Sequence, residues 1–207
     1  YTLKIDGSYF TLQNITIENN AAKLGQAVAL HIEGDHVLIQ NCRILGNQDT
    51  VYTGRAGSRM AFYDCYIEGT TDFIFGPSLA WFENCEIHSK ANSYITAASS
   101  PAGQKYGYVF NNCKLTADAD VDKVYLGRPW RPFAATIFMN CEMGKHICAA
   151  GWDNWRNPKN EETARYAEYN NHGEGAKTIG RVAWSKQLTK KEAAKVTILN
   201  AFGEDCW

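Results

Sequence analysis

Two aspartates, Asp49 and Asp72, occupy equivalent places in the chain, since each lies seven residues after a cysteine of the same short pattern. The cysteines are Cys42 and Cys65. If the segments that carry them stack as adjacent strands, the two carboxyl groups lie roughly 5–6 Å apart, near the strand spacing. Carboxylates at that distance resist ionising together, so one retains its proton and the pair can divide the roles of acid and nucleophile.

The surroundings of Asp72 favour this chemistry over the alternative, a pair of solvated aspartates in turns. Residues 73–76 (FIFG) form an apolar stretch beside Asp72 that would remove water from its carboxyl group. Arg128, within residues 126–130 (LGRPW), carries a permanently charged fork that can bind one carboxylate and fix its orientation. The competing interpretation of Arg128 is a salt bridge at the surface.

A repeat that occurs six times indicates which elements position these groups. Each copy has an apolar residue, then Asn or Asp two positions later, then Cys or Ile, and another apolar residue two positions after that. The copies begin at Leu12, Ile39, Phe62, Phe82, Phe110 and Phe138, at spacings of 27, 23, 20, 28 and 28 residues. A repeat of this length built on short alternating strands is typical of a solenoid, and we predict an all-β, right-handed parallel β-helix.

In this fold equivalent positions of successive coils stack, which predicts two columns of side chains. The cysteines of the repeat should lie inside the coils as small apolar residues, because their spacing fits no zinc site and parallel side chains make poor disulfide geometry. The Asn or Asp before each should form a ladder of side-chain hydrogen bonds. The repeat cysteines are Cys42, Cys65, Cys85, Cys113 and Cys141, whereas Cys148 and Cys206 lie outside the pattern.

We predict a single domain for residues 1–207, with coils to about residue 150 and loops, strands and a capping helix beyond it. Residues 166–169 and 181–184 are predicted strands. Thr189 and Glu192 have the spacing of a capping box, which predicts a helix that runs to about Leu199 and covers an end or flank of the coils.

The composition excludes several classes of function. The chain is 45% hydrophobic and 21% charged with a net charge of −1, which provides no electrostatic field for binding nucleic acid or an anionic membrane. No apolar run approaches the ~20 residues of a membrane-spanning helix. The chain opens on Tyr1 rather than Met, so we expect a mature product or a fragment.

Several segments of the chain resemble, in order, the signature segments of the pectin methylesterases: 26–30 (QAVAL), 48–50 (QDT), 72–76 (DFIFG), 126–130 (LGRPW) and 151–155 (GWDNW). The resemblance covers nearly the whole chain, and the repeats look more like bacterial than plant members. It implies a secreted or periplasmic esterase that acts as a monomer on methyl-esterified homogalacturonan (pectin) and requires no metal or other cofactor. Family members usually have a Gly-x-Tyr-x-Glu segment before the first motif. Its absence here implies missing N-terminal coils and an uncapped surface for self-association.

The resemblance implies a role for each matching polar residue. Asp72 would attack the ester carbonyl of a methylated galacturonate unit. Asp49 would protonate the departing methanol and then activate the water that hydrolyses the acyl-enzyme. Gln26 and Gln48 would donate hydrogen bonds to the oxyanion, and Arg128 would hold Asp72 ionised. These roles agree with general acid–base, nucleophilic and oxyanion chemistry.

Aromatic residues of the same segments would bind the sugar rings, namely Phe75, Trp130 and Trp152. The competing interpretation of the two tryptophans is packing in the core or against the flank of the coils.

Three other functions stay open. A retaining glycosidase also uses carboxyl groups about 5 Å apart, but it leaves Gln26 and Gln48 without a role, and a calcium-dependent lyase needs a cluster of several carboxylates. A non-catalytic β-helix that binds pectic polysaccharide would leave Asp49 and Asp72 dispensable. A serine esterase is not supported, because the chain has no Gly-x-Ser-x-Gly segment.

Overall fold

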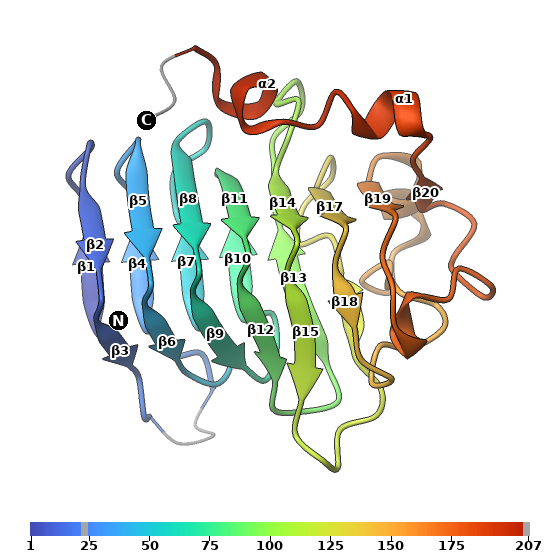
Figure 1. The fold of residues 1–207 in the computed structure, drawn as a ribbon, viewed down its shortest axis with the longest axis horizontal. Coiled ribbons are helices and arrows are strands. Elements are labelled where there is room, and N and C mark those ends of the chain that lie inside the picture. Colours follow the sequence, from blue (N-terminus) through green and yellow to red (C-terminus); the bar gives the residue numbers. More distant parts are fainter. Residues whose placement is uncertain (22–24, 205–207) are drawn as a thin grey trace.

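The six repeats fold as successive coils, and each coil contributes one short strand to each of three parallel sheets (Figure 1). The computed structural model describes residues 1–21 and 25–204, and these residues form the predicted right-handed parallel β-helix.

From β1 to β18 the strands follow one another in the order A, B, C around each coil, so every third strand belongs to the same sheet, and the last two strands both extend sheet B. Sheet A contains β1 (Leu3–Ile5), β4 (Leu30–Ile32), β7 (Val51–Thr53), β10 (Ile74–Gly76), β13 (Tyr94–Ala98) and β16 (Tyr125–Gly127). Sheet B contains β2 (Thr11–Gln13), β5 (Val37–Gln40), β8 (Arg59–Tyr63), β11 (Leu79–Glu83), β14 (Tyr108–Asn111), β17 (Ala135–Met139), β19 (Arg165–Tyr169) and β20 (Lys186–Gln187). Sheet C contains β3 (Thr16–Glu18), β6 (Arg43–Leu45), β9 (Tyr66–Gly69), β12 (Glu86–Ser89), β15 (Lys114–Ala117) and β18 (Glu142–Met143).

Side chains of the repeat stack in register inside the coils. The strand pairings place Ile39 beside Phe62 and Phe62 beside Phe82, which matches the spacing of the repeats. Four fully buried phenylalanines form a column with ring centroids 4.6, 4.4 and 4.3 Å apart: Phe62, Phe82, Phe110 and Phe138. Stacking therefore supplies a core that no single coil could build.

The predicted column of cysteines is confirmed. All five cysteines of the repeat are buried and free, and each thiol donates to a backbone carbonyl of the preceding coil, as Cys65 Sγ does to Ile39 O at 3.6 Å. Cys148 is free and half-buried, and Cys206 lies outside the described residues.

The predicted column of Asn and Asp is present, but its ladder is incomplete. Every member has a left-handed backbone with φ between 51° and 57°, a conformation that these short polar residues tolerate. The Asn41 amide donates directly to the Asn14 carbonyl oxygen in the coil before it. Asn112 instead donates to Glu83, a residue of the neighbouring strand. The turn geometry, rather than a continuous amide ladder, explains the residue type at these positions.

Beyond residue 150 one predicted strand is confirmed and one is wrong. Residues 166–169 lie in β19, which continues sheet B beyond the sixth repeat. Residues 181–184 form a turn and loop, because Arg181 points inward and pairs with the buried Glu168 at 2.8 Å. The loops also contain the 3₁₀ helices η1 (Pro158–Glu162) and η2 (Glu174–Ala176).

The predicted C-terminal helix is two short helices that lie along the outer face of sheet B (Figure 1). The capping box at Thr189 is confirmed and begins α1 (Lys190–Ala193). This helix ends before Leu199, because the extended Thr197 caps a second helix, α2 (Ile198–Phe202). None of the helices in the described part of the chain is long and apolar enough to span a membrane.

Candidate active site

Turns that lead into sheet A bring the two aspartates together. Asp49 and Asp72 each lie two residues before a strand, β7 and β10, and Val51 pairs with Ile74. The two side chains therefore lie on adjacent coils, as predicted. Both residues have a left-handed backbone, with φ of 65° and 49°. The Asp72 N–H donates to Tyr94 O in the next coil at 2.8 Å, which fixes the turn against its neighbour.

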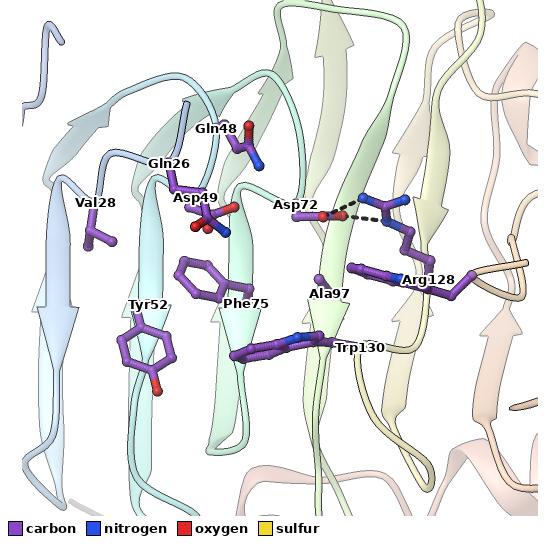
Figure 2. Close-up of a pocket in the computed structure, with 11 residues that line it drawn as sticks. Gln26, Val28, Gln48, Asp49, Tyr52, Asp72, Phe75, Ala97, Arg128 and Trp130 are labelled. Carbon is purple, nitrogen blue, oxygen red and sulfur yellow. Dashed lines mark hydrogen bonds and ion pairs between the residues drawn. The ribbon is translucent and has the colours of Figure 1, made fainter. Parts of the chain in front are cut away.

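The two carboxyl groups lie in a cavity of about 450 Å³ beside sheet A (Figure 2). Relative exposure is 4% for Asp49 and 6% for Asp72, so both are largely shielded from water. The cavity is also lined by five other residues of the predicted site: Gln26, Gln48, Phe75, Arg128 and Trp130.

Arg128 binds one of the two carboxylates through both oxygens. Its Nε donates to Asp72 Oδ1 at 3.0 Å and its Nη2 donates to Asp72 Oδ2 at 2.7 Å (Figure 2). The interpretation of Arg128 as a surface salt bridge is therefore wrong, since its partner is buried. The guanidinium also lies against two rings, with Cζ 3.9 Å from the centroid of Tyr94 and 3.7 Å from a ring of Trp155.

The electrostatic surroundings make the two aspartates unequal. Burial and the nearby charge of Asp72 raise the pKa of Asp49 to about 7, and a hydrogen bond from Gln26 opposes part of this shift. Burial also raises the pKa of Asp72, while the two hydrogen bonds and the charge of Arg128 act to lower it. Because Arg128 bonds only to Asp72, the negative charge is favoured there and the proton is favoured on Asp49.

Aromatic rings form one side of the cavity, below the carboxyl groups in Figure 2. Tyr52 stacks on Phe75 with centroids 4.7 Å apart, and Trp130 meets Phe75 edge-on at 5.9 Å. Gln26 and Gln48 lie on the opposite side, close to Asp49 (Figure 2). The cavity thus has an apolar surface for a ring or methyl group and amide groups near the carboxyl pair.

Trp152 does not line the cavity, so its predicted role as a sugar platform is wrong. Its side chain is 1% exposed, stacks on Tyr166 at 4.3 Å, and donates through Nε1 to Glu168 at 3.3 Å. The competing interpretation, packing in the core, is the correct one.

Four residues of the lining were not singled out from the sequence: Val28, Tyr52, Ala97 and Trp155. Tyr52 pairs with Phe75, so the coil register that aligned the aspartates could have found it. Trp155 lies in segment 151–155, one of the segments that resemble the family, but a role in sugar binding was predicted there for Trp152 alone. No pattern pointed to Tyr94. No cluster of three His, Cys, Asp or Glu side chains suited to a metal ion occurs within residues 1–21 and 25–204.

Comparison with known proteins gives a consistent family. The family model described as Pectinesterase matches residues 1–205. Pectinesterase 31 of Arabidopsis thaliana is 42% identical over 191 residues, which cover 91% of this chain and 60% of that protein. The solved structure of pectin methylesterase from carrot superposes with a TM-score of 0.92 at 32% identity, covering 99% of this chain and 68% of that one.

A further solved structure is a pectin methylesterase mutant in complex with a hexasaccharide. It superposes with a TM-score of 0.81 at 28% identity, covering 97% of this chain and 72% of that one. The chain therefore spans less than two thirds of the Arabidopsis relative and about two thirds of the carrot protein. The plant origin of these two gives no support to the predicted likeness to bacterial members.

Proposed function

The chain belongs to the pectinesterase family, and on that premise we propose that it hydrolyses the methyl esters of galacturonate units in pectin. The observation that carries the proposal is the asymmetric pair of buried aspartates, of which only Asp72 is bound by Arg128. An ionised carboxylate is a nucleophile without a separate base, and its neutral neighbour is an acid.

In the first half of the proposed reaction Asp72 attacks the ester carbonyl carbon. The carbonyl oxygen becomes an oxyanion, which the amide groups of Gln26 and Gln48 stabilise without neutralising Asp72. The C–O bond to the methoxy group then breaks, and Asp49 gives its proton to the departing methanol. The products of this half are methanol, ionised Asp49 and a mixed anhydride between Asp72 and the galacturonate carboxyl group.

In the second half Asp49 accepts a proton from a water molecule that attacks the anhydride. The bond between the acyl group and Asp72 breaks, which frees the galacturonate carboxyl group and restores the Asp72 carboxylate. Asp49 again carries its proton, so the site returns to its starting state. Both steps require Asp49 to exchange a proton near neutral pH, and the pKa of about 7 for this group supports that role.

We propose methyl-esterified homogalacturonan as the substrate and partner. Tyr52, Phe75 and Trp130 present apolar surface of the kind that packs against the faces of sugar rings. The hexasaccharide in complex with a related pectin methylesterase supports an oligosaccharide as the ligand. Because pectin is a polymer of the plant cell wall, we propose action as a single domain outside the cytoplasm, by a secreted or periplasmic protein.

Product analysis tests this proposal against the three other functions. The chain is incubated with highly methylated homogalacturonan, and methanol, new reducing ends and unsaturated ends are measured on the same samples. We expect methanol without chain shortening. New reducing ends would indicate a glycosidase and unsaturated ends a lyase, and binding without any product would indicate a non-catalytic β-helix.

A further inference from the structure

Two aromatic rings lie against the guanidinium that binds Asp72. The Cζ atom of Arg128 lies 3.9 Å from the ring centroid of Tyr94 and 3.7 Å from a ring of Trp155. A guanidinium stacks favourably on aromatic faces, most strongly on indole and where water is excluded. We propose that Tyr94 and Trp155 are positioning residues that clamp Arg128, so that the edge of its guanidinium stays aligned with the carboxylate of Asp72. This inference rests on the proposed function, in which Asp72 is the nucleophile.

Tyr94 contacts both partners of the ion pair. Its ring covers Arg128, and its backbone carbonyl accepts the Asp72 N–H at 2.8 Å. The same ring stacks on Tyr125 at 5.2 Å, and the two residues pair in register between β13 and β16. The residue that supplies one ring of the clamp is therefore part of sheet A.

Trp155 reaches Arg128 from a strained loop. The backbone φ is 60° at Trp155 and 53° at Arg156, and such consecutive left-handed conformations are unfavourable for large residues. The Trp155 N–H donates to Asp153 Oδ1 at 2.7 Å, which holds this backbone in place. Strain that persists in this way is concentrated at functional sites, and here its result is an indole ring stacked on Arg128.

The loop that carries Trp155 is anchored to the strand that carries Arg128. The Leu126 N–H donates to Gly151 O at 2.7 Å, and the Asp153 N–H donates to Gly127 O at 3.1 Å. Two backbone hydrogen bonds thus join the loop to β16 just before Arg128. The indole is held in register with the guanidinium instead of resting on it from a separate part of the fold.

Alignment of the guanidinium matters because Asp72 is buried. Burial raises the pKa of Asp72, and the two hydrogen bonds from Arg128 act against that shift. The charged and titratable groups around the carboxyl group of Asp72 are Asp49, Arg128, Asp153, Tyr94 and Tyr166. A guanidinium that tilts loses one of its two hydrogen bonds, so the pKa of Asp72 rises and less of the nucleophilic carboxylate is present at a given pH.

Four variants and one matched control test the clamp. Trp155→Leu and Tyr94→Leu each remove one ring, whereas Trp155→Phe and Tyr94→Phe keep an aromatic face. Tyr66→Leu is the control, because the Tyr66 ring lies 4.2 Å from Arg43 Cζ on sheet C and does not line the cavity. It removes a guanidinium–aromatic contact of the same kind elsewhere on the fold.

Two readouts are needed, carboxyl NMR titration of Asp72 and the pH profile of kcat/KM for methanol release. In each leucine variant we expect the pKa of Asp72 and the rising limb of the profile to move upward by about one unit, so that the rate is about tenfold lower on the acid limb and about twofold lower at the original optimum. KM of Tyr94→Leu should stay within about twofold of the parent value, since Tyr94 does not line the cavity and acts on Asp72 through Arg128. The phenylalanine variants and Tyr66→Leu should keep the parent titration.

Two results would overturn the clamp. Because Trp155 also lines the cavity, a higher KM with an unchanged Asp72 titration would assign it to substrate binding instead. An unshifted titration of Asp72 in both leucine variants would show that neither ring positions Arg128. If one leucine variant does not fold, the titration of the other decides.

The NMR titration requires no activity, so it separates this inference from the proposed function. If the parent chain releases no methanol but the leucine variants still have a raised pKa of Asp72, the proposed esterase activity is rejected and the clamp is retained. Methanol release with no shift would retain the esterase and remove the clamp.

Discussion

At the residue scale, two aspartates on adjacent coils acquire different chemistry because one arginine binds only one of them. Arg128 uses two N–H groups on the two oxygens of Asp72. Asp49 has no such partner and is buried beside the charge of Asp72, which raises its pKa. The division into an ionised and a protonated carboxyl group follows from position alone and needs no difference in residue type.

Asp49→Asn should stabilise the fold at neutral pH. Burial and Asp72 raise the pKa of Asp49 from 3.8 to about 7, so the native state retains a proton that the unfolded state loses between these values. Stability is therefore lost as pH rises from about 4 to about 7. The loss is on the order of 2 kcal/mol, because solvent screening reduces the effect of the full pKa shift. By calorimetry we expect the Tm of Asp49→Asn to exceed that of the parent by about 5 °C at pH 8 and by about zero at pH 4.

Asp64→Asn is the matched control for that comparison. Asp64 has the same left-handed backbone, with φ of 53°, but lies on an exposed turn. Its substitution should change stability by no more than about 0.5 kcal/mol. Equal Tm values for Asp49→Asn and the parent at pH 8 would show that ionised Asp49 costs the fold nothing.

The carboxyl pair could be predicted from the sequence, whereas the choice between two tryptophans could not. Asp49 and Asp72 were found because residues at the same offset from two stacked cysteines lie close together on adjacent coils. Trp152 and Trp155 are three residues apart in one motif, and Trp155 reaches the cavity only through a left-handed backbone. No strand or helix periodicity encodes such a conformation at a non-glycine residue.

At the scale of the element, β16 carries Arg128 to the cavity through a very close approach to β13. A Cβ atom at Gly127 would overlap Thr96 Oγ1, and that hydroxyl donates to Leu126 O at 2.9 Å. The glycine of the segment LGRPW is therefore required by the packing of two adjacent strands.

Gly127→Ala should weaken both stability and activity. Overpacking of this kind costs about 1–3 kcal/mol, so we expect Tm to fall by about 5 °C. Arg128 follows directly and would be displaced from Asp72, so methanol release should fall by about tenfold. Gly7→Ala, where an added Cβ meets nothing within 4 Å, is the control and should match the parent in both assays. A Gly127→Ala chain with parent Tm and activity would refute this account of the glycine.

The last strands show where a repeat ceases to be readable. Glu168 of β19 pairs with Phe138 of β17, so a carboxylate takes the place of the next ring in the phenylalanine column. It is neutralised by Arg181, which also donates to Gly175 O at 2.7 Å. The buried ion pair replaces the apolar pattern here, so the sequence predicted strands at both 166–169 and 181–184, although only the first is part of a strand.

At the scale of the whole molecule, stability is distributed along a stack in which each coil contacts its neighbours. The aromatic column runs through four successive coils without interruption, and each of its members stacks on the rings directly before and after it in the column. Such a solenoid depends on nearest-neighbour interfaces, so a defect in a middle coil weakens two interfaces at once.

Phe110→Ala should be among the most destabilising single substitutions. Phe110 is fully buried and stacks on Phe82 at 4.4 Å and on Phe138 at 4.3 Å. Removal of the ring should cost about 3–5 kcal/mol and lower Tm by about 10 °C in a thermal denaturation experiment. Phe10→Ala is the control, because Phe10 is 41% exposed and should tolerate the change. Similar losses in the two variants would contradict the importance of the column.

The architecture of the molecule was the most predictable property of this sequence. The spacings of 20 to 28 residues between copies of one pattern match the strand register of sheet B, in which the first residues of successive copies pair. The helices on the flank were less predictable, because their boundary depends on Thr197, a local cap within a sequence that otherwise continues a helical pattern.

The most direct test of the account is methanol release from highly methylated homogalacturonan by the parent chain and by Asp72→Asn. Asparagine retains the size of the side chain and tolerates the left-handed backbone at this position, but it cannot attack an ester as a carboxylate. The account predicts release by the parent and by Asp64→Asn, and a loss of at least about a thousandfold in Asp72→Asn. Release by Asp72→Asn at the rate of the parent would contradict the assignment of Asp72 as the nucleophile and, with it, the mechanism.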